Sequence, residues 1–194
     1  MTKKNISVRT ERFYSAHHTL LRLAKHELEK AEAEEAGWAN SQFSAITFSA
    51  LAIEAICNAV GERVIDNWGD FESCSPIAKV RLICEHLGTG YDASREPWGS
   101  FVSLCKTRNL IGHPKAEPIV YEAILTELEH KNMAYANAPE SKLEKRMILD
   151  NAQKSVATVE KLIKLFCDKL THEQKFGIEF DMWHLSATLQ PDTN

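Results

Sequence analysis

The chain has 194 residues, of which 44% are apolar and 26% are charged, and this composition excludes a disordered or fibrous protein. Its formal net charge of −4 at pH 7 excludes a global basic field that would attract nucleic acid, but leaves room for a local basic patch. Only 8 glycines and 6 prolines occur, so tight turns are few and an all-α fold is favoured.

Hydrophobic periodicity predicts six helices, over about residues 7–36, 41–67, 76–87, 97–112, 119–136 and 141–175. Gly37 is the expected end of the first helix, and Ser75-Pro76 is a typical start for the third. Ser141 and Glu144 have the spacing of a capping box at the start of the sixth. We therefore expect a single antiparallel helical bundle over residues 1–176. A tail over 177–194 is expected either as an extended arm or packed against a partner.

The second predicted helix is apolar on several sides, which is typical of a helix in the middle of a bundle. Glu54 and Asn58 interrupt its most apolar stretch, residues 43–60, so we interpret it as a core helix and not as a membrane span. The two polar residues lie one turn apart on the same face. Glu54 is a structural carboxylate with its own hydrogen bonds, a group that fixes a functional cation, or a third catalytic group.

The cysteines indicate a reducing compartment. They are five in number, widely spaced and without a C-x-x-C pair, at positions 57, 74, 84, 105 and 167. The first twelve residues lack the apolar core of a signal peptide. A cytoplasmic location with no membrane partner is expected. His17-His18 and the pair Cys74 and Cys84 have no further ligands at metal-binding spacing, so neither a metal nor another cofactor is predicted.

One segment, residues 105–115, combines charge with a helix end. Arg108 falls on the inward face of the fourth helix, where a charged group must be paired or must line a cleft. Gly112 and Pro114 end that helix, so the ring of His113 can turn back toward Arg108. The segment also carries Lys106 and Lys115 and no acid, which suits a small anionic target.

The pattern Arg-Asn-x-x-x-His, formed by residues 108–113, resembles the signature of HEPN domains, in which four to six residues separate an arginine from a histidine. The apolar second helix, with Glu54 and Asn58 inside it, and the short third helix ahead of the motif are also similar to that family. The resemblance covers residues 10–135, and the sixth helix would complete the bundle.

The resemblance implies a homodimer in which two motifs face one cleft, and many such domains are metal-independent endoribonucleases. His113 would exchange a proton with the ribose 2′-OH or the leaving oxygen. Arg108 would stabilise the phosphate, and Asn109 would orient either group, with Lys106 and Lys115 as further contacts to the substrate. Glu54 and Asn58 would support the site. Such an enzyme would suit a toxin or a defence protein, held by a cognate antitoxin or a regulatory protein.

Alternatives to an active ribonuclease stay open. In them, Arg108 would anchor the bundle by pairing with Glu54, and His113 would be a cap at the helix end. The domain would then be a non-catalytic module that binds a nucleotide, RNA or protein partner, or a purely structural dimer.

In one toxin subgroup of the family, a tyrosine two residues after the histidine is modified by a partner enzyme. Lys115 stands at that place, so this regulation does not carry over.

Overall fold

The computed structural model describes residues 6–34, 36–120, 122–128, 139–179 and 182–189. Most of them are helical, as expected for the all-α class. The helices are α1 (Ala16–Glu32), α2 (Trp38–Val64), α3 (Pro76–His86), α4 (Trp98–Gly112) and α6 (Leu149–Cys167), with short 3-10 turns at η1 (Trp68–Phe71) and η3 (Glu144–Arg146). Two strands, β1 (Ile6–Phe13) and β2 (Met182–Leu189), complete the described elements.

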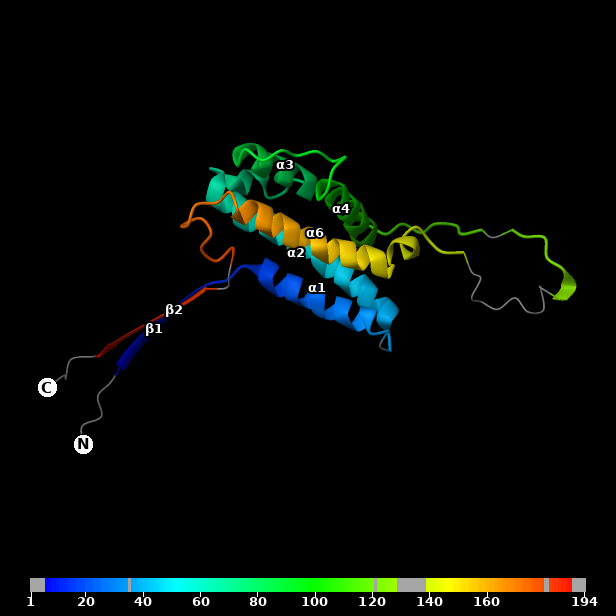
Figure 1. The fold of residues 1–194 in the computed structure, drawn as a ribbon, viewed down its shortest axis with the longest axis horizontal. Coiled ribbons are helices and arrows are strands. Elements are labelled where there is room, and N and C mark those ends of the chain that lie inside the picture. Colours follow the sequence, from blue (N-terminus) through cyan, green and yellow to red (C-terminus); the bar gives the residue numbers. More distant parts are fainter. Residues whose placement is uncertain (1–5, 35, 121, 129–138, 180–181, 190–194) are drawn as a thin grey trace, which may run out of the picture.

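Helix α2 lies in the middle of the bundle and packs against α1, α3, α4 and α6 (Figure 1). Each residue is at most 1% exposed in the consecutive pairs Ala45 and Ile46, Ala52 and Ile53, and Ile56 and Cys57. Neighbours on a helix point about 100° apart, so the expected burial on more than one side is confirmed. Among the described helices, α2 alone is long and apolar enough to cross a membrane by length and composition. Its most apolar window is 56% buried inside the fold, as in the core helix of a bundle.

Helices α3 and α4 begin and end close to the positions that their capping residues predict. Ser75 Oγ accepts a hydrogen bond of 3.3 Å from the Ala78 amide, and Pro76 follows as the first helical residue. Helix α4 begins directly after Pro97 and ends at Gly112, as predicted. Local capping therefore positions the end of α4, where the candidate motif lies.

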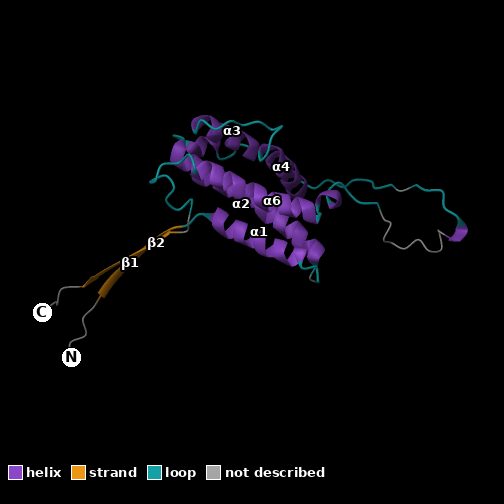
Figure 2. Cartoon of the chain, viewed as in Figure 1, coloured by secondary structure: helices purple, strands orange, loops and turns teal. Residues whose placement is uncertain are grey.

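The predicted helix over residues 7–36 is wrong in its first part. Residues 6–13 form β1, which pairs antiparallel with β2 from Ile6 opposite Leu189 to Phe13 opposite Met182. This ribbon leads away from the helices (Figures 1 and 2). Alternating β-branched residues at 6, 8 and 10 favour the extended form once a partner strand exists.

The predicted fifth helix is absent from most of the residues where the structure describes it. Residues 119–120 and 122–126 have no helical structure, residues 127–128 are helical, and residues 121 and 129–136 lie outside the described part. The capping box of the sixth helix does form, with Ser141 Oγ accepting from the Glu144 amide at 3.1 Å and Glu144 Oε2 accepting from the Ser141 amide at 2.7 Å. It opens only η3, and α6 begins at Leu149 and ends at Cys167, before the expected residue 175.

The residues after α6 return to the bundle before β2 begins. Ile178 is fully buried, and its carbonyl oxygen accepts a hydrogen bond of 2.9 Å from His17 Nε2. His17 is itself fully buried, and its Nδ1 lies 2.5 Å from Ser15 Oγ. The histidine therefore joins the start of α1 to the segment after α6.

Candidate functional site

The C-terminal end of α4 sets the position of the predicted motif. His113 is the residue after the last helical one, with φ −133° and ψ 58°, and its amide donates to Asn109 O at 3.0 Å. Pro114 has no amide hydrogen and disfavours helical geometry in the residue before it, so the chain leaves the helix here. The His113 side chain is exposed, which leaves the imidazole free to meet a ligand.

Arg108 connects α4 to the central helix. Its Nη2 donates a hydrogen bond of 3.0 Å to Glu54 Oε2 on α2, and its Nη1 donates one of 3.4 Å to Asn109 Oδ1. The side chains of Arg108 and Glu54 are 33% and 30% exposed, so the ion pair is neither buried nor fully in water. The guanidinium is therefore held in place and still reachable from solvent.

A lysine that the sequence interpretation did not single out completes this network. Lys79 on α3 is 1% exposed, and its Nζ donates a hydrogen bond of 2.9 Å to Asn58 Oδ1. The same ammonium lies 4.0 Å from Glu54 Oε1. Each carboxylate oxygen of Glu54 thus faces one cation, either Arg108 or Lys79. Asn58 accepts a hydrogen bond from Lys79, the more deeply buried of the two cations. We call Glu54, Asn58, Lys79 and Arg108 the core charge network.

A signal for Lys79 was present in the sequence. Residues four apart share one helix face, and Lys79 precedes Ile83 by four on a helix whose buried residues are Lys79, Val80, Ile83 and Cys84. Val80 and Cys84 carry the rest of this buried face, and Ile77 and Leu87 pack beside it, partly buried. Glu54 and Asn58 inside α2 need hydrogen-bond donors, and Lys79 on the neighbouring helix α3 can supply them.

Arg108 and His113 line the same open pocket, of about 270 Å³. The rest of its wall is apolar or small, from Thr47, Ala50 and Leu51 on α2 and from Ile111 and Gly112 on α4. Of the predicted substrate contacts, Lys106 and Lys115 are exposed but do not line this pocket. Asn109 is also exposed and reaches the site through Arg108.

Two buried cysteines lie beside the network, and both are poor nucleophiles. Burial raises the pKa of Cys105 to about 12, although the Arg108 cation lowers it in part. Burial also raises the pKa of Cys57 well above that of an ordinary thiol. Because the thiolate is the reactive form, neither cysteine is a candidate nucleophile near neutral pH.

No metal centre is evident in the part of the chain that the structure describes, where no three side chains of His, Cys, Asp or Glu are grouped to hold an ion. Fold and pocket together define a helical bundle with a cation-lined pocket at the end of one helix. Comparison of the chain with family models, with curated proteins and with solved structures finds no match.

Proposed function

We propose that this chain is a HEPN-like protein that cleaves RNA through Arg108 and His113. The observation that supports the proposal is that both side chains line one open pocket, with the guanidinium fixed from behind by Glu54. A fixed cation next to a reachable imidazole suits a phosphodiester, because an arginine can bind the phosphate with two hydrogen bonds and an imidazole can exchange a proton with a hydroxyl group.

The chemistry would be an attack by the ribose 2′-OH on the adjacent phosphate. A neutral His113 accepts the 2′-OH proton as the new O2′–P bond forms, and the P–O5′ bond breaks to leave a 2′,3′-cyclic phosphate. The departing O5′ takes a proton from an imidazolium. Arg108 stabilises the charge that builds up on the phosphate oxygens. Asn109 contributes by accepting a hydrogen bond from Arg108 and so fixing its plane.

One histidine cannot conveniently be both the base and the acid in a single step, and a second copy of the chain would supply the other. The pocket wall offers a surface for such a dimer, since Leu51 is 40% exposed beside Ala50 and Ile111. We therefore propose a homodimer in which these apolar residues meet and two pockets share one cleft. A toxin or defence role, with a cognate antitoxin or regulatory protein and a cytoplasmic location, would follow from this activity.

The Arg108–Glu54 ion pair also favours a second candidate function. A guanidinium that donates to Glu54 at 3.0 Å and to Asn109 at 3.4 Å has a structural role of its own. The pocket would then belong to a non-catalytic module that binds a nucleotide, RNA or protein partner.

The deciding experiment is cleavage of a labelled single-stranded RNA in excess EDTA. Wild type, Arg108→Ala and His113→Ala are compared with two matched controls on exposed helix positions, Arg22→Ala and His86→Ala. We expect wild type and both controls to leave cyclic phosphate ends, and the two site variants to lose at least about 100-fold in rate. Circular dichroism and sedimentation check that every variant is folded and has the wild-type oligomeric state.

The alternatives give different results in the same experiment. A folded wild type that cleaves no RNA, but binds it through Arg108, supports the non-catalytic module. Full activity in His113→Ala rejects the proposed mechanism. Unfolding of Arg108→Ala alone shows that the arginine is an anchor, and Arg108→Lys, which keeps the charge toward Glu54 but not the planar fork, then tests its catalytic part.

A further inference from the structure

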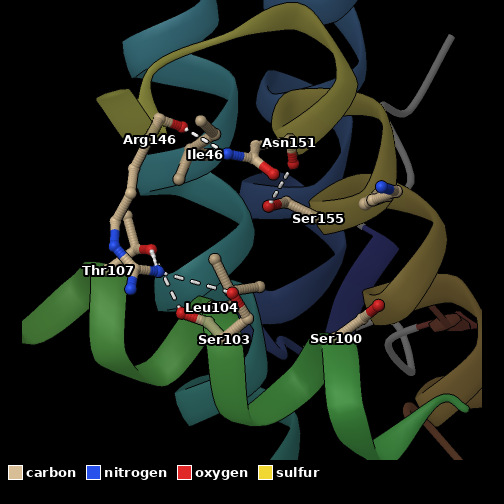
Figure 3. A pocket seen from close by; sticks show the side chains of 9 residues that line it. Ile46, Ser100, Ser103, Leu104, Thr107, Arg146, Asn151 and Ser155 are labelled. Atoms are coloured by element: carbon tan, nitrogen blue, oxygen red, sulfur yellow. Dashed lines mark hydrogen bonds between the residues drawn. The ribbon is translucent and has the colours of Figure 1, made fainter. Parts of the chain in front are cut away.

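A second pocket lies on another side of α4, between this helix and α6 (Figure 3). Its wall includes Ser103 and Thr107 from α4, Arg146 from η3, and Lys154 and Ser155 from α6. Thr107 directly precedes Arg108, so the two pockets flank one helix. No part of the proposed cleavage chemistry uses this second pocket.

Arg146 is the central side chain of the second pocket. Its Nη1 donates to Thr107 Oγ1 at 3.2 Å and to Ser103 Oγ at 3.4 Å (Figure 3). Both acceptors are neutral hydroxyls, and among the described residues no carboxylate forms an ion pair with this guanidinium. Arg146 is half-buried, so its charge is partly removed from water without a counter-charge. An anion would supply the missing partner.

Two hydroxyl groups of the pocket donate to backbone carbonyls, and the hydrogen of a third has no acceptor among the described residues. Thr107 and Ser155 are 5% and 7% exposed, and their hydroxyls donate to the carbonyl oxygens of Ser103 at 3.1 Å and Asn151 at 2.6 Å. These two groups therefore support the wall. Ser103 Oγ accepts from Arg146, and among the described groups nothing accepts its hydrogen. The Ser103 hydroxyl is thus available to donate to a ligand.

The charge around the pocket is positive. Lys154 lines the wall and pairs with Asp150 at 2.6 Å, but both side chains are about 60% exposed, and such a surface pair is weak enough to exchange for a ligand. Ile148 gives helix α6 no side-chain cap, so its first turn, which brings Asn151 to the pocket wall, adds positive potential there. The Asn151 amide group donates to Arg146 O at 2.9 Å, and its Oδ1 is an acceptor on the wall. Ser100 Oγ donates to Glu96 Oε1 at 2.9 Å, so Arg146, Ser103 and Lys154 are the donors that can meet an anion.

The size of the pocket limits the ligand. Its volume of about 40 Å³ corresponds to roughly three water molecules. A small tetrahedral oxyanion such as phosphate therefore suits the space better than a larger ligand. The half-buried Arg146, which has no ion pair among the described residues, the Ser103 hydroxyl and this small volume together point to an oxyanion.

We infer that this second pocket binds a phosphate group through Arg146, Ser103 and Lys154. The phosphate is either inorganic phosphate or a backbone phosphate of the RNA that reaches Arg108 and His113. The second source rests on the proposed function, whereas binding itself does not. On an RNA strand, the pocket would fix one phosphate beside the cleavage site and so set which bond lies at His113.

The test for binding is a titration with inorganic phosphate, followed by amide chemical shifts in NMR spectra. Sodium chloride keeps the ionic strength constant, so that general screening does not change. We expect saturable shifts at Ser103, Thr107 and Ser155. Arg146→Gln should weaken binding by about tenfold or more, since it removes a charge-assisted contact. The control Lys145→Gln removes the same charge from the adjacent exposed residue and should keep wild-type binding.

Three results would overturn the assignment: no saturable shift at these amides, an equal loss in Lys145→Gln, or full binding in Arg146→Gln. If Arg146→Gln is unfolded, Ser103→Ala tests the same site, because Ser103 is exposed and Arg146 keeps its hydrogen bond to Thr107. Weaker phosphate binding in Ser103→Ala then supports the site, and unchanged binding rejects it.

The source of the phosphate is tested with a short single-stranded RNA. If the phosphate belongs to RNA, Arg146→Gln raises the dissociation constant for RNA and shifts the cleavage position, and inorganic phosphate competes with RNA. If RNA binding is unchanged while phosphate binding is lost, the ligand is free phosphate and the RNA source is rejected. If the chain cleaves no RNA, only the proposed function is rejected. The phosphate titration does not depend on cleavage, so it still tests the second pocket.

Discussion

Arg108 on α4 donates its Nη2 hydrogen to Glu54 Oε2 on α2 at 3.0 Å. The other oxygen of the same carboxylate lies 4.0 Å from the ammonium of Lys79 on α3, which is buried. One carboxylate of the central helix therefore serves cations from two neighbouring helices. The position of the arginine in the first pocket depends on the charge balance inside the bundle.

Replacing Glu54 should destabilise the fold. Glu54→Gln removes the charge that faces both Arg108 and Lys79, and leaves the buried ammonium with only the amide of Asn58. Breaking a buried ion pair typically costs about 3–5 kcal/mol, and the 30% exposure of Glu54 reduces this. We expect a loss of about 2 kcal/mol in the free energy of unfolding. Urea unfolding measures it, and Glu62→Gln, exposed on the same helix, should change little.

Two substitutions of Lys79 separate the contribution of its charge to the free energy of unfolding from that of its buried volume. Lys79→Ala leaves a cavity and unpaired acceptors on Asn58 and Glu54, so it should lower stability by about 3 kcal/mol. Lys79→Met keeps most of the buried chain and should lose clearly less. The two variants are compared by urea unfolding with Lys161→Met, which changes an exposed lysine on α6. Equal losses in the Ala and Met variants would show that packing contributes nothing here.

Gly61 on α2 allows close contact with Trp68 of η1. A Cβ atom at position 61 would overlap the indole ring, which is itself 3% exposed. Gly61→Ala should therefore cost about 1–3 kcal/mol and change the tryptophan fluorescence of the folded state. Gly69→Ala, where a Cβ meets nothing within 4 Å, is the matched control. A neutral Gly61→Ala would mean that Trp68 is free to move aside.

The buried thiol of Cys105 should make stability depend on alkaline pH. Its pKa is about 12 in the folded chain, against about 8.5 in an unfolded one. Between these values only the unfolded form loses the proton, so stability is complete below about pH 8.5 and falls as pH rises. The stability of wild type relative to Cys105→Ala should drop by about 1.4 kcal/mol per pH unit.

Urea unfolding at about pH 8 and about pH 10, on either side of the free thiol pKa, measures this difference. Val80→Ala is the control, since it shortens another buried side chain that does not titrate. Its difference from wild type should be independent of pH. A constant difference between wild type and Cys105→Ala would show that the folded thiol ionises as easily as the unfolded one.

The elements that the sequence predicts well are those with local signals at their ends. Helix α3 follows Ser75-Pro76 and α4 lies between Pro97 and Gly112, so capping chemistry within a few residues fixes both. The alternative interpretation of Arg108 as a partner of Glu54 also describes a contact that the structure contains. The Arg108–Glu54 pair could be predicted because the sequence pattern already places both side chains on the inward faces of their helices.

The incorrect predictions involve contacts that no local pattern reports. Residues 6–13 are extended because they pair with residues 182–189, at the other end of the chain. The apolar residues after Pro118 have helical spacing, but Val120 and Ile124 are 73% and 105% exposed, so they bury little apolar surface that would stabilise a helix. Lys79 was missed because its partners lie on another helix, and a lysine by itself indicates an exposed position.

The ribbon of β1 and β2 has a consequence for synthesis on the ribosome. Strand β1 precedes the described helices in the chain, and its partner Met182–Leu189 follows them. Because β1 cannot pair before β2 is made, and a two-stranded ribbon has little stability of its own, Ile6–Phe13 is an unpaired strand while the helices between them are synthesised. A chaperone could bind this strand during that time.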